Sequence, residues 1–376
     1  MSGVDDIKDN AQLCFTWSCD QATLSPLSVR PAAVFILSIF YYYPLILTQD
    51  AKPVVCFLAG EMWNSRGTGY VFNVNELPEP CDIFIVGQFP MDLGDDVGII
   101  KQDENAMISL IESNKIVYLR IGFKYQQDWY SILYPEDANQ VKTQKFDLIV
   151  NFLKKHNIRG LFMWFPFLLD GDIPNVSQKL SDFVTSIKNE VDGLKVGIEF
   201  YAFDQISNKT RIDFTLINEV IDHFVIDLTN LNACDENSKK YGLDPISSET
   251  MLSIDTITNI VTKSTVDQSK LFAKIQASVI KPSDLVEKGA LTITTYSKYC
   301  DDQEDTSRWC GNPSKLSYDQ GAYVAQFYSG LFIENLDADD FLCKCGCKKF
   351  PVTNLIIDGW KKCDFTTCPK LDKKAI

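Results

Sequence analysis

The sequence has many cysteines and few histidines, which limits the chemistry that its side chains can perform. Twelve cysteines and two histidines occur among 376 residues. Two histidines give little support to a His-rich zinc site or a His-based catalytic triad. Five cysteines near the C-terminus have spacings that could also bind zinc: Cys343, Cys345, Cys347, Cys363 and Cys368. In a secreted chain such a group is more typical of disulfides, so we expect no metal and no cofactor.

The charge and composition exclude several classes of protein. The chain carries 36 Lys and Arg against 50 Asp and Glu, a formal net charge of −14. Nucleic-acid binding needs clustered basic residues, so we expect no nucleic-acid partner. A hydrophobic content of 45% is that of a globular protein.

One long apolar run, residues 31–48, lies near the N-terminus. It contains two prolines, follows Arg30 and precedes the polar residues 49–52. It is short and irregular for a spanning helix but fits a secretory signal. The polar residues 1–29 before it fit a start codon assigned too far upstream or a signal anchor with a short cytoplasmic tail. A buried core segment is the third alternative.

We therefore expect residues 1–51 to be an N-terminal extension with a signal peptide or anchor, and residues 52–376 to form the secreted protein. Without Cys14 and Cys19, ten of the twelve cysteines remain, an even number that suits a disulfide framework. The sequons at Asn175 and Asn208 would then be glycosylated. We expect an extracellular monomer with no membrane span after cleavage.

Short apolar runs then alternate with longer amphipathic stretches. Eight runs are predicted strands: residues 53–58, 82–86, 116–121, 160–164, 196–201, 224–228, 271–275 and 330–335. Helical patterns lie between several of them, as at 137–156 and 177–191. This order predicts a (β/α)8 TIM barrel in one domain, with the site at the C-terminal ends of its strands. A doubly wound sheet is the alternative, but its Gly-rich phosphate turn is missing.

Five stretches in this order resemble glycoside hydrolase family 18 chitinases and chitinase-like lectins. The most specific are GLFIENLDADDF at 330–341 and the spacing of Cys56 and Cys81. The others are IVYLRIGFKYQQDWYSIL with the helix that follows it, LTITTYSKYC at 291–300, and LSYDQ at 316–320. The resemblance implies a chitinase-like barrel whose small insertion domain is reduced or absent, because few residues separate Lys274 from Tyr296.

The family motif that carries catalysis is degenerate in this sequence. Family members have Asp-Gly-x-Asp-x-Asp-x-Glu at the end of the fourth strand, where the Glu is the general acid and the substrate's acetamido group is the nucleophile. The corresponding positions here have no carboxylate: Arg159, Phe162, Trp164, and Phe165 or Pro166 in place of the acid. A general acid cannot be replaced by Phe or Pro. The resemblance thus implies a pseudoenzyme that has lost chitinase activity.

Four carboxylates near strand ends are candidates to substitute for the lost acid. Glu199 and Glu334 lie near the ends of the fifth and eighth predicted strands, and Asp170 and Asp172 follow the fourth. The alternative function is therefore an active glycosidase that uses a relocated acid such as Glu199. Solvated or structural roles are the simpler interpretation of these carboxylates.

Binding can survive the loss of catalysis. Family clefts hold chitin by stacking aromatic rings on sugar faces. The candidate ligand-binding residues are Trp164, Phe123, Tyr201, Tyr318, Asp319 and Glu334. Against this, Phe162, Met163 and Phe165 could simply fill the barrel. The implied partner is chitin or a chitooligosaccharide, or a cell-surface receptor for a growth-factor-like or immune-modulating ligand.

The resemblance also implies disulfides. It pairs Cys56 with Cys81, and Cys300 with Cys343 or Cys345, of which we select Cys345. The partners of the other cysteines stay open: Cys234, Cys310, Cys343, Cys347, Cys363 and Cys368.

Overall fold

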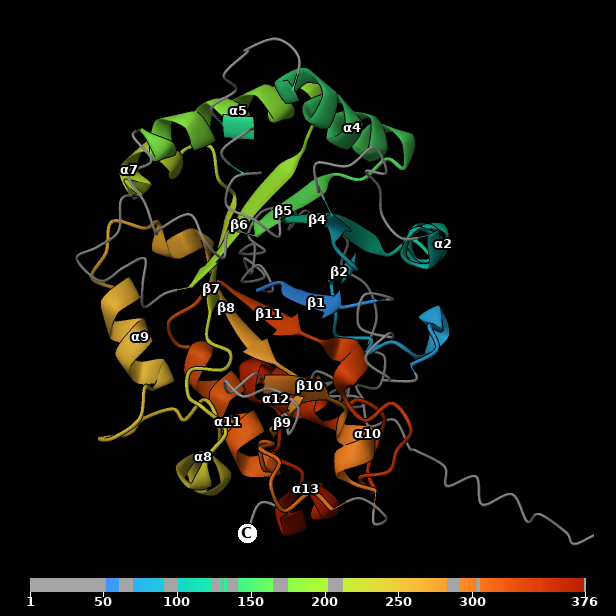
Figure 1. The fold of residues 1–376 in the computed structure, drawn as a ribbon, viewed down its shortest axis with the longest axis vertical. Coiled ribbons are helices and arrows are strands. Elements are labelled where there is room, and N and C mark those ends of the chain that lie inside the picture. The colour runs from blue at the N-terminus through green and yellow to red at the C-terminus, as the bar shows by residue number, and fades with distance from the viewer. Residues whose placement is uncertain are drawn as a thin grey trace, which may run out of the picture.

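Eight parallel strands form a closed barrel in the computed structural model. The structure describes residues 52–60, 70–90, 101–122, 129, 132–133, 141–164, 175–201, 212–282, 291–301 and 305–374. The barrel strands are β1 (Val54–Leu58), β2 (Ile83–Val86), β4 (Ile116–Gly122), β5 (Gly160–Trp164), β6 (Lys195–Tyr201), β7 (His223–Asp227), β8 (Leu271–Gln276) and β11 (Gly330–Glu334). Each strand pairs with its neighbour, and the pairs β1–β11 and β2–β4 complete the ring. The predicted TIM barrel is confirmed (Figure 1).

Helices surround this barrel (Figure 1). They are α2 (Lys101–Glu112), α4 (Val141–Lys155), α5 (Val176–Glu190), α7 (Phe214–Ile217), α8 (Glu236–Tyr241), α9 (Ile254–Val261), α10 (Tyr296–Tyr299), α11 (Ser314–Val324), α12 (Pro351–Lys361) and α13 (Pro369–Lys374). In α5, Leu180, Phe183, Val184 and Ile187 are buried. Their spacing puts one apolar stripe against the strands. Helices α4 and α5 lie on one side of the barrel, and α11, α12 and α13 lie on the opposite side.

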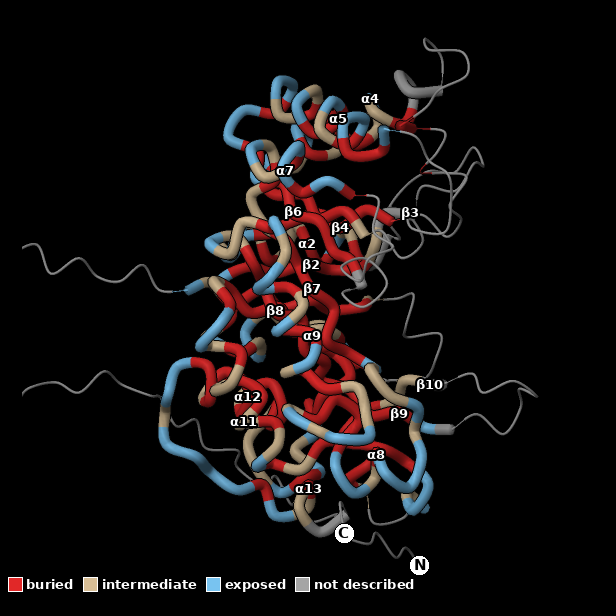
Figure 2. The backbone as a smooth tube through the Cα atoms, turned by 90° about the vertical axis from the view of Figure 1, so that its left-hand side faces the viewer, coloured by how far each residue is buried: buried red, intermediate tan, exposed pale blue. Residues whose placement is uncertain are grey.

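The buried residues form two layers because neighbouring side chains of a strand point to opposite faces. Phe162 belongs to the cluster inside the barrel, whereas Met163 belongs to the layer between strands and helices. Met163 therefore does not fill the barrel interior, contrary to that part of the expectation. Phe162 does, and Gly197 on β6 makes room for it, since a Cβ there would lie 2.2 Å from its ring. Figure 2 shows the buried strands at the centre of the molecule.

The segment between β8 and α11 is small. It forms a two-stranded antiparallel ribbon, β9 (Val279–Pro282) with β10 (Leu291–Thr294), and the four-residue helix α10. In the described part of the chain, the insertion domain is thus reduced to this ribbon. The remaining short elements are β3 (Phe89–Pro90), which pairs with β4, and the 3-10 helices at Val74–Glu76, Gln268–Lys270 and Leu336–Ala338.

Disulfides hold the C-terminal segment to the barrel. Four are Cys56–Cys81, Cys234–Cys310, Cys300–Cys345 and Cys347–Cys368. Cys343 and Cys363 are also disulfide-bonded. The two pairings that the resemblance implies are therefore present, and no described cysteine is free.

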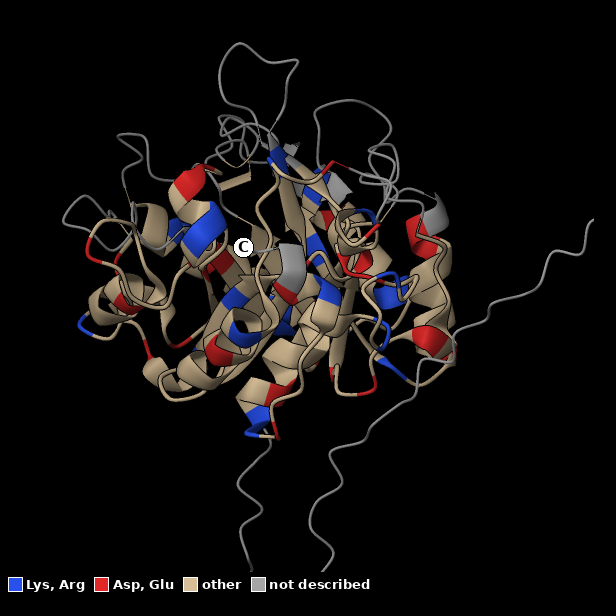
Figure 3. Ribbon diagram, turned by 90° about the horizontal axis from the view of Figure 1, so that it is seen from below, with Lys and Arg blue, Asp and Glu red and all other residues tan. Residues whose placement is uncertain are grey.

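Within the described residues, no helix has the length and apolar character needed to cross a membrane. The apolar run at 31–48 lies outside them. Lysines and arginines are interspersed with acidic residues over the described elements (Figure 3).

Candidate functional site

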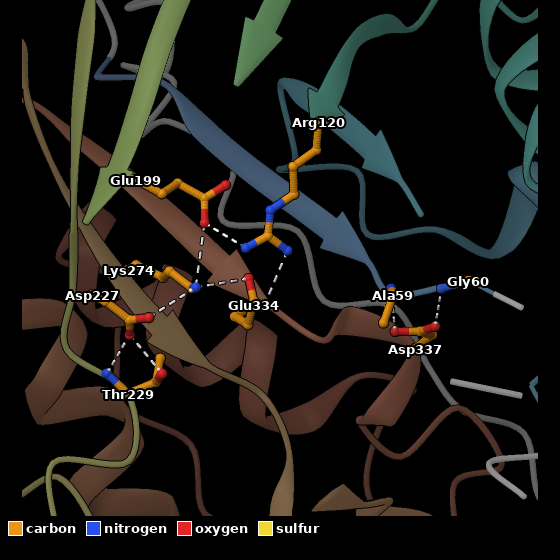
Figure 4. A network of polar contacts seen from close by, with 9 residues as sticks. All are labelled: Ala59, Gly60, Arg120, Glu199, Asp227, Thr229, Lys274, Glu334 and Asp337. Atoms are coloured by element: carbon orange, nitrogen blue, oxygen red, sulfur yellow. Dashed lines mark hydrogen bonds and ion pairs between the residues drawn. The ribbon is translucent and has the colours of Figure 1, made fainter. Parts of the chain in front are cut away.

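Five charged side chains lie inside the barrel, toward the C-terminal ends of its strands. We call them the ion cluster: Arg120 of β4, Glu199 of β6, Asp227 of β7, Lys274 of β8 and Glu334 of β11. Each follows apolar residues that are buried on both faces of its strand. Charged side chains from five strands therefore lie close together inside the barrel (Figure 4).

The ion cluster is continuous. The Nη2 of Arg120 lies 2.6 Å from Glu199 Oε2, and its Nη1 lies 3.5 Å from Glu334 Oε1. The Nζ of Lys274 lies 3.3 Å from Glu199 Oε2, 3.0 Å from Asp227 Oδ2 and 3.4 Å from Glu334 Oε2. The other oxygen of Asp227 accepts hydrogen bonds from the backbone and side chain of Thr229, at 2.9 and 2.6 Å. Each cation thus bridges at least two carboxylates.

Burial makes these contacts energetically important. Glu199 is 1% exposed and Arg120 is 4% exposed, whereas Glu334 is the most accessible member at 12%. Removing one partner of a buried ion pair leaves an uncompensated charge. The cluster is therefore a cooperative unit of the barrel.

The pKa values in the cluster follow from this arrangement. Burial by itself would lower the pKa of Lys274, but the facing carboxylates more than offset it, and the pKa is raised. Burial raises the pKa of Glu334, an effect that the cations Lys274 and Arg120 oppose without cancelling it. The neighbouring carboxylates Glu199 and Asp227 add to the effect of burial and also raise the pKa of Glu334.

Two aromatic rings contact the guanidinium of Arg120. Its Cζ lies 4.3 Å from the ring centroid of Phe57 and 5.4 Å from that of Trp164. These are cation–π distances. Trp164 is half-buried, and its backbone carbonyl accepts a hydrogen bond of 3.2 Å from Trp129 Nε1. Trp164 therefore lies beside the Arg120 end of the ion cluster.

Among the described residues, three polar atoms of the cluster make no hydrogen bond: Arg120 Nε, Glu199 Oε1 and Glu334 Oε2, the last of which lies 3.4 Å from Lys274 Nζ. Buried polar atoms are usually satisfied. The cluster thus retains hydrogen-bonding capacity that its own members do not use.

The structure brings together three of the residues that the sequence selected. Trp164, Glu199 and Glu334 meet at the ion cluster, and Phe162 lies below it within the barrel. Arg159 is exposed and precedes the first residue of β5, at the opposite end of that strand. Its side chain binds Asn157 Oδ1 and the backbone carbonyl of Asp192.

Tyr318 and Asp319 do not join this group. They lie on α11, in the helical layer outside the barrel. The hydroxyl of Tyr318 donates to the carbonyl of Cys363 at 2.7 Å, and Asp319 forms an ion pair with Lys315. The physical reason is the continuous helix from Ser314 to Val324, whose buried face includes Ser317, Gln320, Gly321 and Val324.

Other candidates cannot be placed in the site. Phe123, Phe165, Pro166, Asp170, Asp172 and Asn208 lie outside the described residues, as does the side chain of Tyr201. Asn175 is exposed at the residue before α5.

Arg120, Asp227 and Lys274 were missed by the sequence reasoning, although a signal for them existed. Each is a charged residue inside a predicted strand of otherwise apolar residues. Such residues are seldom fully buried unless they are paired. Strand alternation then puts them on the barrel's inner face with Glu199 and Glu334.

The acidic residues that follow β11 have a structural role. Asp337 accepts hydrogen bonds of 2.9 Å from the backbone amides of Ala59 and Gly60, which joins β11 to the end of β1. Asp339 accepts from the amides of Val352 and Thr353 in the first turn of α12. Asp340 accepts from Cys345 N at 2.6 Å. The carboxylates of this stretch therefore fix the chain path.

Glu199 contacts both cations of the cluster, at 2.6 Å from Arg120 Nη2 and 3.3 Å from Lys274 Nζ. Among the described residues, no group of three or more His, Cys, Asp and Glu side chains is arranged to hold a metal ion.

Comparisons with known proteins support the fold. No family model and no curated protein sequence matches the chain significantly. Solved structures do match. Catalytic domain 2 of a Group II chitinase from Ostrinia furnacalis, a mutant in complex with penta-N-acetylchitooctaose, has a TM-score of 0.66 at 16% identity. The match covers 86% of this chain and 100% of that one.

Two further neighbours belong to the same group of folds. Human YKL-39, described as a pseudo-chitinase with retained chitooligosaccharide binding properties, has a TM-score of 0.63 at 14% identity, covering 83% of this chain and 100% of its own. An immunomodulatory active chitinase from Trichuris suis has a TM-score of 0.62 at 12% identity, with 82% and 100% covered. At these identities the likeness establishes the fold, which hydrolytic and non-hydrolytic proteins share.

Proposed function

We propose that this chain is a secreted, non-hydrolytic chitinase-like protein that binds N-acetylglucosamine oligosaccharides at the mouth of its barrel. The observation that carries the proposal is the ion cluster beside Trp164. The inward side chains at the end of β5 are aromatic, and the nearest carboxylates are bound to Arg120 and Lys274.

The surroundings of Trp164 support a binding role. Its indole is half-buried at the end of β5, and Arg120 and Gly122 contact it from within the barrel. These contacts restrict the indole ring, which lowers the entropic cost of stacking a sugar on it. The neighbours described as binding chitooligosaccharides support the choice of ligand.

The compartment is part of the proposal. The disulfides support an oxidising environment, and we include removal of residues 1–51 and glycosylation of the exposed Asn175. A hydrolytic function through Glu199 is not favoured, because its carboxylate is buried and bridged by two cations.

Retention on chitin tests this proposal. Purified protein should be retained on chitin beads and released by soluble chitooligosaccharide. Trp164→Ala should weaken binding about tenfold or more, since loss of a central tryptophan costs about 2 kcal/mol or more. Phe327→Ala, which removes an aromatic residue that is 42% exposed on the helical layer, is the matched control and should bind normally. No retention of the wild-type protein would contradict the proposal.

A further inference from the structure

The ion cluster contains one more carboxylate than cation. Glu199, Asp227 and Glu334 face Arg120 and Lys274, and these are the charged groups that the five strands bring together. With all five ionised, the cluster has a net charge of −1. A further cation at the barrel mouth would balance it.

The unsatisfied atoms indicate what kind of cation fits. Glu199 Oε1, on a side chain that is 1% exposed, can accept a hydrogen bond, and Arg120 Nε can donate one. Glu334 Oε2 lies 3.4 Å from Lys274 Nζ without accepting a hydrogen bond from it. The carboxylates of Glu199 and Glu334 both contact the guanidinium of Arg120 (Figure 4). A complementary ligand carries an ammonium group beside a hydroxyl group, because a hydroxyl both accepts and donates.

A glucosamine unit has this chemistry, with an amine on one ring carbon and hydroxyls on its neighbours. An N-acetylglucosamine unit has a neutral amide in place of the ammonium. Hydrogen bonds that involve a charged group are about twice as strong as neutral ones. The cluster therefore distinguishes the two sugars by charge.

We propose that the barrel mouth prefers deacetylated or partly deacetylated chitooligosaccharides, with a glucosamine ammonium bound between Glu334 and Glu199. This inference rests on the proposed oligosaccharide-binding function and specifies its ligand. Glu334 is the member an incoming amine meets first, because it is the most exposed carboxylate of the cluster. Trp164, beside the Arg120 end of the cluster, supplies the stacking surface.

A proton competes with the ammonium for the same place. Burial raises the pKa of Glu334, so its carboxyl binds a proton more readily than an exposed glutamate does, whereas an ammonium bound beside it would favour the carboxylate form. Binding of glucosamine should therefore release protons. Binding of the acetylated sugar should not.

Calorimetry of the wild-type full-length protein tests the inference. Glucosamine pentamer and N-acetylglucosamine pentamer are titrated at a pH just below the pKa of the sugar amine, in two buffers of different ionisation enthalpy. The glucosamine pentamer should bind about tenfold more tightly or better, as a charge-assisted hydrogen bond predicts, with proton release that depends on the buffer. Equal affinity, or preference for the acetylated pentamer, would overturn the inference and leave the proposed function intact. Binding of neither pentamer would overturn both.

The variant Glu334→Gln tests the role of the negative charge of Glu334, because it removes the charge and keeps the size of the side chain. It leaves two carboxylates for two cations, so the barrel should fold, which circular dichroism checks. The preference for glucosamine over the acetylated pentamer and the proton release should be lost. Glu76→Gln, which removes a carboxylate paired with Lys349 at the surface, should retain the preference. A preference that survives Glu334→Gln would overturn the inference.

Discussion

At the scale of single residues, Arg120 joins the carboxylates of the ion cluster to two aromatic rings. It bridges Glu199 and Glu334 and contacts the rings of Phe57 and Trp164. Its positive charge has two anionic partners in an environment with little water. A neutral side chain of similar length would keep the packing and lose the charge.

Arg120→Met should therefore destabilise the protein strongly. Glu199 and Glu334 would share Lys274 with Asp227, and breaking a buried ion pair in this way costs about 3–5 kcal/mol. Urea unfolding measures the change. Arg159→Met is the matched control, because Arg159 is exposed and surface polar contacts are worth about 1 kcal/mol or less. Similar losses in both variants would show that the ion cluster has no special role.

The sequence predicted only part of this site, for a physical reason. Glu199, Glu334 and Trp164 were selected because they stand at strand ends, where barrel sites form. The ion pairs depend on which strands face each other across the barrel. That arrangement is set when the barrel closes, and no local sequence pattern reveals it. Tyr318 was selected from a local resemblance, but a continuous helix places it outside the barrel.

At the scale of elements, helices α11 and α12 pack unusually closely. A Cβ added to Gly321 would lie 1.9 Å from the carbonyl oxygen of Ile356. One added to Gly359 would lie 2.0 Å from the carbonyl oxygen of Tyr318. The backbone of each helix thus packs directly against a glycine of the other helix. A side chain at either glycine would require one helix to move.

Gly321→Ala should destabilise the protein even though alanine favours helix formation. The higher helix propensity of alanine alone would raise the free energy of unfolding by about 1 kcal/mol. The clash of the added methyl group with the Ile356 carbonyl oxygen should lower the free energy of unfolding by about 2 kcal/mol or more, as in overpacked cores. Thermal melting gives the sign directly. A raised melting temperature would contradict the observed packing.

The barrel strands were predictable because each is a run of apolar residues buried on both faces. All eight predicted strands are present, with ends that differ by at most one residue. Helices α4 and α5 were predictable from their apolar stripes. The glycine contact between α11 and α12 had no such signal, because a glycine inside a helix does not show which backbone it meets.

At the scale of the whole molecule, buried carboxyl groups couple stability to pH. Burial raises the pKa of Asp244 and Asp339 to about 7 and that of Asp337 to about 6. In the unfolded chain these groups lose their protons near pH 4. Between these values the folded protein binds more protons than the unfolded chain, so stability falls as pH rises. Burial lowers the pKa of His223 to about 4, which opposes this trend below the ordinary histidine value.

Three carboxyl groups outweigh one histidine, so the protein should be more stable at about pH 5 than at about pH 8. Urea unfolding at constant ionic strength measures the difference. In Asp244→Asn, the amide oxygen can still accept the hydrogen bond from Leu231 N, but the side chain cannot ionise. The variant should therefore show a smaller change of unfolding free energy between about pH 5 and about pH 8. Stability that rises steadily over this interval would contradict the assignment of these groups.

Hydrolysis and binding of one substrate, measured in the same sample, test the central claim most directly. Purified protein is incubated with N-acetylglucosamine pentamer, binding is measured by calorimetry, and the sugar is then examined by mass spectrometry. We predict a bound and intact pentamer. Shorter products that form with purified wild-type protein and disappear with Glu199→Gln or Glu334→Gln would contradict a non-hydrolytic barrel and identify the acid that replaced the missing one.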